Sequence, residues 1–189
     1  MCNFENNAHP VCSWTNDESA DFKWRRVQGE EINDGDRYKN TQQANGPDRD
    51  HTLGKLKSIY LFKKQTIYIE INLGTAKGHF LFLDTTPPHK PNDTARVVSP
   101  VFALTTSKQC QMRFWYHMYG YDTGALNIYT RNYIGGPLTK IWSQDGGKGD
   151  EWLRAKVVLE VTQSFQVLIE GVRGPNYQGI LFEIIFSSY

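Results

Sequence analysis

The sequence predicts an all-β sandwich, and three observations lead to that fold class. Apolar and polar residues alternate with the two-residue period of a strand in most apolar stretches of the 189-residue chain. Clusters of glycine, proline, asparagine and aspartate separate these stretches at short intervals. No capped amphipathic helix of ten or more residues can be found. Short strands that are rich in aromatic residues and separated by turns are typical of a two-sheet sandwich.

The clearest strand is expected over residues 110–118. The residues that share its apolar face are Cys110, Met112, Phe114, Tyr116 and Met118. The residues of the opposite face are Gln111, Arg113, Trp115 and His117. Because successive side chains of a strand point to opposite sides, the first face is expected in the core and the second outside it.

Three further strands follow with the same period. Residues 125–131 place Leu126 and Ile128 on one face, and Asn127 and Tyr129 on the other. Two more alternating stretches cover residues 155–161 and 165–172, and turns are expected at residues 120–124, 135–137, 145–149 and 171–179. The sequence thus predicts consecutive short strands joined by tight turns.

Composition excludes several classes of protein. A chain of this length with 39% hydrophobic residues can bury one full core, so a single domain over residues 1–189 is expected. The formal net charge of +1 gives no field for binding nucleic acid. There is no apolar run of about 18 residues, so membrane association is expected only through a longer parent protein.

Ten short motifs occur in an order that is similar to the MAM domain, the module named for meprin, the neuropilin antigen and receptor phosphatase mu. They are CNFE, CSWTND, DFKW, GPDRDHT, GHFLFLDTT, ARVVSP, CQMRFWYHMYG, GALNIYTR, IWSQDGGKGDEWLRAKVVL and FQVLIEGVRGPNYQG. The sequences of these motifs resemble those of the MAM domains in MAM-containing, glycosylphosphatidylinositol-anchored adhesion proteins. The resemblance covers the chain from Cys2 to about Ile180.

The resemblance implies a jelly-roll-like antiparallel β-sandwich on the extracellular side of the membrane. It implies a module for protein–protein contact in cell adhesion or receptor assembly, with protein partners at the cell surface, for which a second copy of the same module is one candidate. The alternative is a glycan-binding jelly roll, whose mark would be exposed aromatic side chains beside carboxylates in a groove. Trp115 and Tyr119 are the aromatic residues expected nearest the surface.

The three cysteines bear on whether the chain lies in an oxidising or a reducing compartment. Cys2 and Cys12 are too far apart for the usual two-to-four-residue spacing of zinc ligands, so a small disulfide loop fits better. In the family the first two cysteines pair with each other, which implies a Cys2–Cys12 bond and an oxidising compartment. The family's third cysteine matches Cys110, whose usual partner beyond the last strand is missing, so Cys110 is expected to be unpaired.

A calcium site and a glycosylation site are the remaining expectations. Glu5 and Asp50 fall where family members with a bound cation have oxygen ligands, although two carboxylates do not fill a calcium shell and Glu5 could equally form a salt bridge or cap a turn. The family's acidic closing motif is replaced by Glu183-Ile184, which leaves such a site short of ligands. Asn92-Asp93-Thr94 is an acceptor sequence for N-glycosylation.

No enzyme is expected. The five histidines include no HExxH motif and no pair four residues apart, and there is no G-x-S-x-G motif or glycine-rich phosphate loop. Cys110 alternates with Met112 and Phe114 in a strand, which favours a buried, inert thiol over a nucleophile.

Two segments depart from the family pattern. Residues 55–74 lie where the family runs almost directly from one motif to the next, and residues 181–189 are apolar where acidic residues are expected. Both look foreign to the domain, as a misplaced exon boundary would produce. The other interpretation of residues 55–74 is a genuine insertion, in which Thr66 to Ile71 forms an extra strand.

Overall fold

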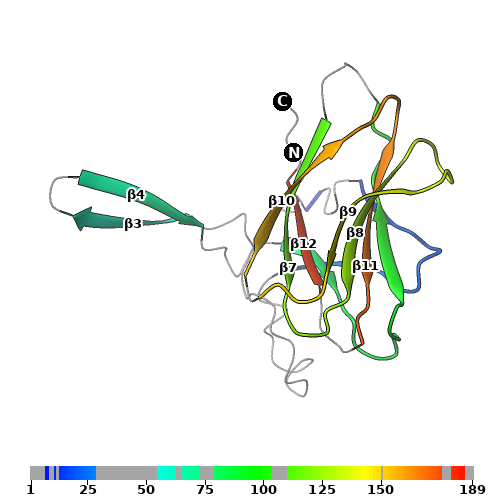
Figure 1. Ribbon diagram of the computed structural model, residues 1–189, viewed down its shortest axis with the longest axis horizontal. Coiled ribbons are helices and arrows are strands. Elements are labelled where there is room, and N and C mark those ends of the chain that lie inside the picture. Colours follow the sequence, from blue (N-terminus) through cyan, green and yellow to red (C-terminus); the bar gives the residue numbers. More distant parts are fainter. Residues whose placement is uncertain are drawn as a thin grey trace.

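The structure is a computed structural model that describes residues 7–8, 11, 13–28, 55–62, 65–72, 79–103, 110–149, 151–175 and 180–185. Within these residues there are strands and turns and no helix, so the expected all-β class is confirmed. Two five-stranded antiparallel sheets face each other as the layers of a sandwich, and a separate hairpin projects to one side (Figure 1).

Most strands that follow one another along the chain lie in different sheets. Sheet A has the order β1 (Thr15–Asn16), β6 (Thr94–Val98), β11 (Gln166–Val172), β8 (Ala125–Arg131) and β9 (Thr139–Asp145). Sheet B has the order β10 (Leu153–Leu159), β7 (Cys110–Met118), β12 (Ile180–Ile185), β5 (His79–Leu83) and β2 (Arg25–Gln28). Consecutive strands such as β7 and β8 therefore lie in opposite layers, as in a jelly roll, although β8 and β9 are neighbours in the same sheet.

The core lies between the two inner faces. Met112, Phe114 and Met118 from β7 are fully buried, and so are Leu126 and Ile128 from β8. This is the alternation that the sequence predicts for both strands, and β7 and β8 begin and end at the predicted residues. Burying a side chain of this size contributes about 1.5 to 3 kcal/mol, so a face of such residues fixes which way the strand points.

Tryptophan residues join the two layers. The ring of Trp142 packs edge-on against Phe114, with 4.9 Å between ring centroids, and Trp24 is buried with its Nε1 donating to the carbonyl oxygen of Ala95 at 3.0 Å. Trp152 packs against Phe80 in a second apolar cluster, on the outer face of sheet B. These three tryptophans thus act in packing and do not form a ligand surface.

Two element boundaries differ from the prediction. The strand expected over residues 155–161 is β10, which begins and ends two residues earlier. The turn expected from residue 171 is wrong at its start, because Gly171 lies inside β11 and faces the core. A Cβ atom at Gly171 would come within 2.5 Å of Leu83 Cδ2 and 2.9 Å of Trp24 Cζ2. This glycine makes room for two core side chains and does not mark a turn.

The two segments that depart from the family pattern, residues 55–74 and 181–189, differ in how they relate to the sandwich. Strands β3 (Lys55–Phe62) and β4 (Gln65–Asn72) pair with each other as a separate two-stranded sheet that projects from the sandwich (Figure 1). β4 includes the extra strand of the insertion interpretation. At the other segment, β12 lies between β7 and β5 in the middle of sheet B. Residues 180–185 are therefore integral to the sandwich, contrary to the expectation that this end is foreign to it.

Candidate functional site

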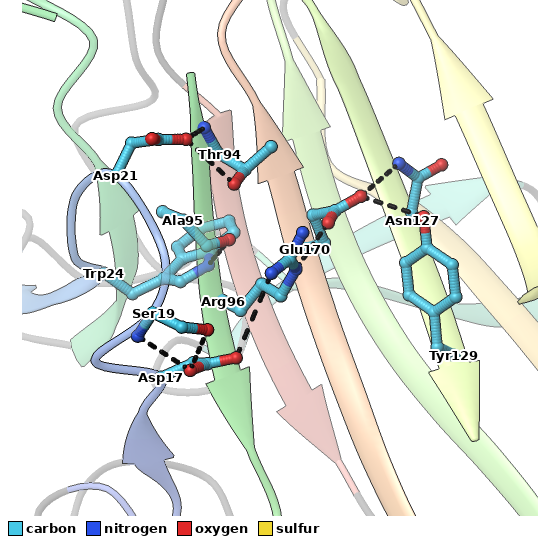
Figure 2. A network of polar contacts seen from close by, with 10 residues as sticks. All are labelled: Asp17, Ser19, Asp21, Trp24, Thr94, Ala95, Arg96, Asn127, Tyr129 and Glu170. Atoms are coloured by element: carbon cyan, nitrogen blue, oxygen red, sulfur yellow. Dashed lines mark hydrogen bonds and ion pairs between the residues drawn. The ribbon is translucent and has the colours of Figure 1, made fainter. Parts of the chain in front are cut away.

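A row of polar side chains crosses the outer face of sheet A (Figure 2). Its centre is Glu170 on β11, the middle strand of the sheet. The strand register places Arg96 of β6 opposite Glu170 on one side and Asn127 of β8 opposite it on the other. Three strands that are far apart in the chain thus bring one anion and its donors together.

The carboxylate of Glu170 accepts three hydrogen bonds. Arg96 Nε donates to Oε2 at 2.6 Å, while Asn127 Nδ2 and Tyr129 OH donate to Oε1 at 3.0 and 2.9 Å. Glu170 is only 5% exposed. A buried carboxylate is tolerated when a cation and good hydrogen bonds compensate its lost hydration, and here both oxygens are engaged. The arrangement holds strands together and leaves no free oxygen on Glu170 for acid–base or metal chemistry.

The network perturbs the pKa of two of its members. Burial, together with the hydrogen bond to Glu170 and its charge, raises the pKa of Tyr129 to about 12. The hydroxyl of Ser19, which donates to Asp17 Oδ1 at 2.7 Å, is the main cause that lowers the pKa of Asp17. Asp17 also lies 4.0 Å from the Arg96 guanidinium. Tyr129 is therefore held as a neutral donor and Asp17 as an anion.

A buried arginine fixes the loops at the end of sheet A where β6 begins. Arg173 is 3% exposed, and its Nε donates to the carbonyl oxygen of Thr85 at 2.8 Å. Its backbone amide donates to Asp93 O at 2.8 Å, and its carbonyl accepts from the amide of Asn92 at 2.9 Å. Arg173 thus connects the loop after β5 with the end of β11.

The opposite end of sheet A exposes large apolar side chains. Tyr133, Ile134 and Leu138 belong to the loop between β8 and β9, and Val101 follows β6. The register of β8, β11 and β6 brings the end of β8, the start of β11 and the end of β6 to this same end. Tyr133 is 63% exposed and Ile134 is 74% exposed. We call Val101, Tyr133, Ile134 and Leu138 the apolar end.

Sequence reasoning missed the apolar end. It selected Trp115 and Tyr119 as surface aromatics, and the structure shows Tyr119 exposed and Trp115 half-buried. The available signal was the stretch Tyr133 to Leu138, in which large apolar residues flank Gly135-Gly136-Pro137. A turn lies at the surface and normally carries small or polar residues. Large apolar residues beside a turn therefore indicate exposed apolar surface.

Most of the predicted site residues lie outside the described residues. This holds for Cys2, Glu5, Cys12 and Asp50. Cys110 is the first residue of β7, and Asn92 is exposed in the turn before β6. Among the described residues there is no group of three or more His, Cys, Asp or Glu side chains that could hold a metal ion, and no helix long and apolar enough to cross a membrane.

Solved structures are similar to this chain in fold. The K2 cleaved adhesin domain of Lys-gingipain matches with a TM-score of 0.56 and 10% identity, covering 99% of this chain and 98% of that one. TmCBM61 in complex with beta-1,4-galactotriose matches with a TM-score of 0.51 and 10% identity, covering 99% of this chain and 100% of that one. At such low identity these likenesses confirm the jelly-roll-like sandwich and nothing more.

Curated relatives are similar in sequence. The human MAM domain-containing glycosylphosphatidylinositol anchor protein 1 is 34% identical over 179 residues, which cover 94% of this chain and 16% of that protein. Neuropilin-1 of Xenopus laevis is 28% identical over 171 residues, which cover 89% of this chain and 14% of that protein. The chain thus spans less than a fifth of the length of these relatives.

A family model supplies the assignment. The model described as MAM domain, meprin/A5/mu matches residues 2–70 and 63–185, two pieces that together span nearly the whole chain. The two pieces overlap within the β3–β4 hairpin, at the position of the predicted insert. The family is a non-catalytic module, which agrees with the lack of an enzyme motif in the sequence. This chain belongs to the MAM domain family.

Proposed function

We propose that this MAM domain is an extracellular adhesion or receptor-assembly module that binds a protein at the cell surface through its apolar end. MAM domains occur in the extracellular parts of membrane and glycosylphosphatidylinositol-anchored proteins, which supports this location. The observation that carries the proposal is the exposure of Tyr133 and Ile134. Tyrosine is enriched among the residues that dominate protein interfaces, and apolar side chains at the centre of a contact contribute most.

The polar face of sheet A supports the choice of the apolar end. Glu170, Asn127 and Arg96 satisfy one another, so a partner on that face would gain little from them. At the apolar end, in contrast, a partner would remove exposed apolar surface from water, which contributes about 25 cal/mol for each Å² buried. A specific contact needs about 800 Å² from each partner, so residues around these four must take part.

Binding to cultured cells tests the proposal. The chain, secreted with an added signal sequence, is compared with the double variant Tyr133→Ser and Ile134→Ser. The matched control is Tyr121→Ser, since Tyr121 is fully exposed but lies in the loop between β7 and β8, at the other end of the sandwich. We expect the double variant to lose most of its binding to cell-surface proteins and the control to keep it. Equal binding by all three proteins would refute this use of the apolar end.

A glycan-binding module is the second candidate. The observation in its favour is the exposure of Tyr119 and Tyr121 in one loop, because exposed aromatic rings can stack on sugars. The similar TmCBM61 was solved with a galactotriose, although the likeness is one of fold. A glycan array at micromolar protein distinguishes the two functions: binding to defined glycans that Tyr121→Ser abolishes would favour the second.

A further inference from the structure

The loop that leads into β6 contains a tight turn with Asn92 at its corner. The amide of Asp93 donates to the carbonyl oxygen of Lys90 at 3.0 Å, which closes a four-residue turn. Pro91 occupies its second position, and Asn92 occupies the third with a φ of 72°. Proline followed by a residue of positive φ is the signature of a type II turn, and asparagine tolerates that φ better than most residues.

The backbone around Asn92 is firmly held. The Asn92 amide donates to Arg173 O at 2.9 Å, and the Arg173 amide donates to Asp93 O at 2.8 Å. Asp93 Oδ2 in turn accepts from the amide of Lys90 at 2.7 Å. Arg173 itself is buried, so the turn is fixed to the body of the domain. Asn92, in contrast, is exposed, which leaves room for a bulky group to extend into solvent.

The residue two positions later completes the acceptor sequence. Asn92-Asp93-Thr94 is the only Asn-x-Ser/Thr tripeptide in the chain. Thr94 is the first residue of β6, and its amide and hydroxyl donate to Asp21 Oδ2 at 2.7 and 3.1 Å. The acceptor therefore lies at the junction of an exposed turn and a paired strand, and only the asparagine must face outward to carry an attached group.

We propose that Asn92 carries an N-linked oligosaccharide in protein made through the secretory pathway. In the transfer, Asn92 Nδ2 loses one proton and bonds to the anomeric carbon of a lipid-pyrophosphate-linked oligosaccharide. The bond from that carbon to the pyrophosphate oxygen breaks, and the lipid pyrophosphate leaves. The inference shares with the proposed function only the passage through the secretory pathway, so a failure of cell binding would leave it intact.

Mass spectrometry of the secreted full chain tests the site. The parent is expected to carry a glycan that an amide-cleaving glycosidase removes, leaving an aspartate labelled with heavy oxygen at position 92 when the digestion is run in heavy-oxygen water. Asn92→Gly should abolish the glycan and keep the melting temperature of the deglycosylated parent, because glycine adopts the positive φ without strain. Thr94→Ser should keep the glycan, since the hydroxyl remains.

A second variant removes the glycosylation signal by a change that also removes a contact within the fold. Thr94→Val removes the glycosylation signal together with the hydroxyl bond to Asp21, so it should lose both the glycan and some thermal stability. Asn92→Asp serves in place of Asn92→Gly if the glycine variant is poorly secreted. A folded, secreted parent whose Asn92 peptide is unmodified in most molecules would overturn the proposal.

Discussion

Glu170 links three neighbouring strands on the outer face of sheet A. Its carboxylate contacts Arg96, Asn127 and Tyr129, which come from the strands on either side of β11. The sequence predicted that Asn127 and Tyr129 face away from the core, but it did not predict that Asn127 is buried. That burial depends on the pairing of β8, β11 and β6, and no local pattern encodes which distant strands become neighbours.

Tyr129 provides a prediction on pH. Its folded pKa of about 12 lies above the ordinary value of 10.0, so the neutral phenol is favoured in the folded state. The stability that results is fully present below pH 10 and is lost as the pH rises through about 12. We expect Tyr129→Phe to cost about 1 kcal/mol at neutral pH, the net value of one hydrogen bond.

The measurement is urea unfolding of parent and variant at pH 7, 10 and 11.5. The difference in free energy of unfolding between the two proteins should shrink at the highest pH, because Tyr129 of the unfolded parent ionises near pH 10 while the folded parent still holds the proton. A difference that is constant over this range would contradict the assigned role of Tyr129. Comparison at each pH cancels the titration of the lysines and other tyrosines that both proteins share.

The amino-terminal cysteines give a second prediction. In protein from a secretory host, Cys2 and Cys12 should be bonded to each other, as the family resemblance implies. Closing a loop of about eleven residues stabilises the fold by roughly 2 to 3 kcal/mol in the chain-entropy model. Non-reducing peptide mapping should find the linked pair, and Cys110 should react as the single thiol after unfolding. Free thiols at both Cys2 and Cys12 would disprove the bond.

Calcium binding is a third prediction at this scale. We propose that Glu5 and Asp50 contribute oxygen ligands to a calcium ion, the hard cation that carboxylates suit. Millimolar calcium should then raise the melting temperature relative to chelator, because a ligand that binds only the folded state stabilises it. Glu5→Gln should remove this rise, while Glu151→Gln, at an exposed position elsewhere, should leave it unchanged. Identical melting of the parent in calcium and in chelator would exclude the site.

At the scale of elements, the strands that sequence predicted best are those with one face in the core. β7 and β8 alternate cleanly, so both their period and their ends could be read from the sequence. β12 was misjudged because its sequence lacks the acidic family motif, yet it pairs with a strand on each side. Its sequence ILFEII is rich in β-branched and aromatic residues, which favour a strand, so its composition suits a paired strand.

The β3–β4 hairpin yields the prediction for this scale. The ten strands of sheets A and B form the sandwich without it, and a two-stranded hairpin alone is at best marginally stable in water. Among the described strands, β3 and β4 pair only with each other, and such apolar, proline-free strands with an open edge favour aggregation. We expect deletion of residues 55–74 to give a more soluble secreted protein with an equal or higher melting temperature.

Light scattering after concentration and a thermal melt provide the measurement for the deletion. A control keeps the hairpin but replaces the apolar residues Ile59 and Ile69 with Lys. Like the deletion, this variant should aggregate less than the parent, because the added charges oppose association of the strands. If the deleted protein is secreted poorly or melts well below the parent, the hairpin is an integral part of the domain and the foreign-segment interpretation fails.

At the scale of the whole molecule, the two ends of sheet A differ in character. One end carries the turn with Asn92 and the loop with Tyr121, and the other carries the apolar end. The strand β8 that separates them has seven residues, so they lie about 20 Å apart. A glycan at the first end would leave the second accessible, which is the arrangement expected for a module that contacts its partner end-on.

Two engineered glycans test this polarity in the intact domain. Ile134→Thr creates an acceptor sequence at Asn132 within the apolar end, and Tyr121→Asn creates one at the opposite end by preceding Asp122-Thr123. Both sites lie in exposed loop positions, so each glycan should be tolerated by the fold and both proteins should melt like the parent. We expect the first to abolish binding to cell-surface proteins and the second to leave it unchanged, with Ile134→Ala showing how much of the first effect comes from the lost side chain. Binding that survives a glycan at Asn132 but fails with one at position 121 would place the contact at the other end of the molecule.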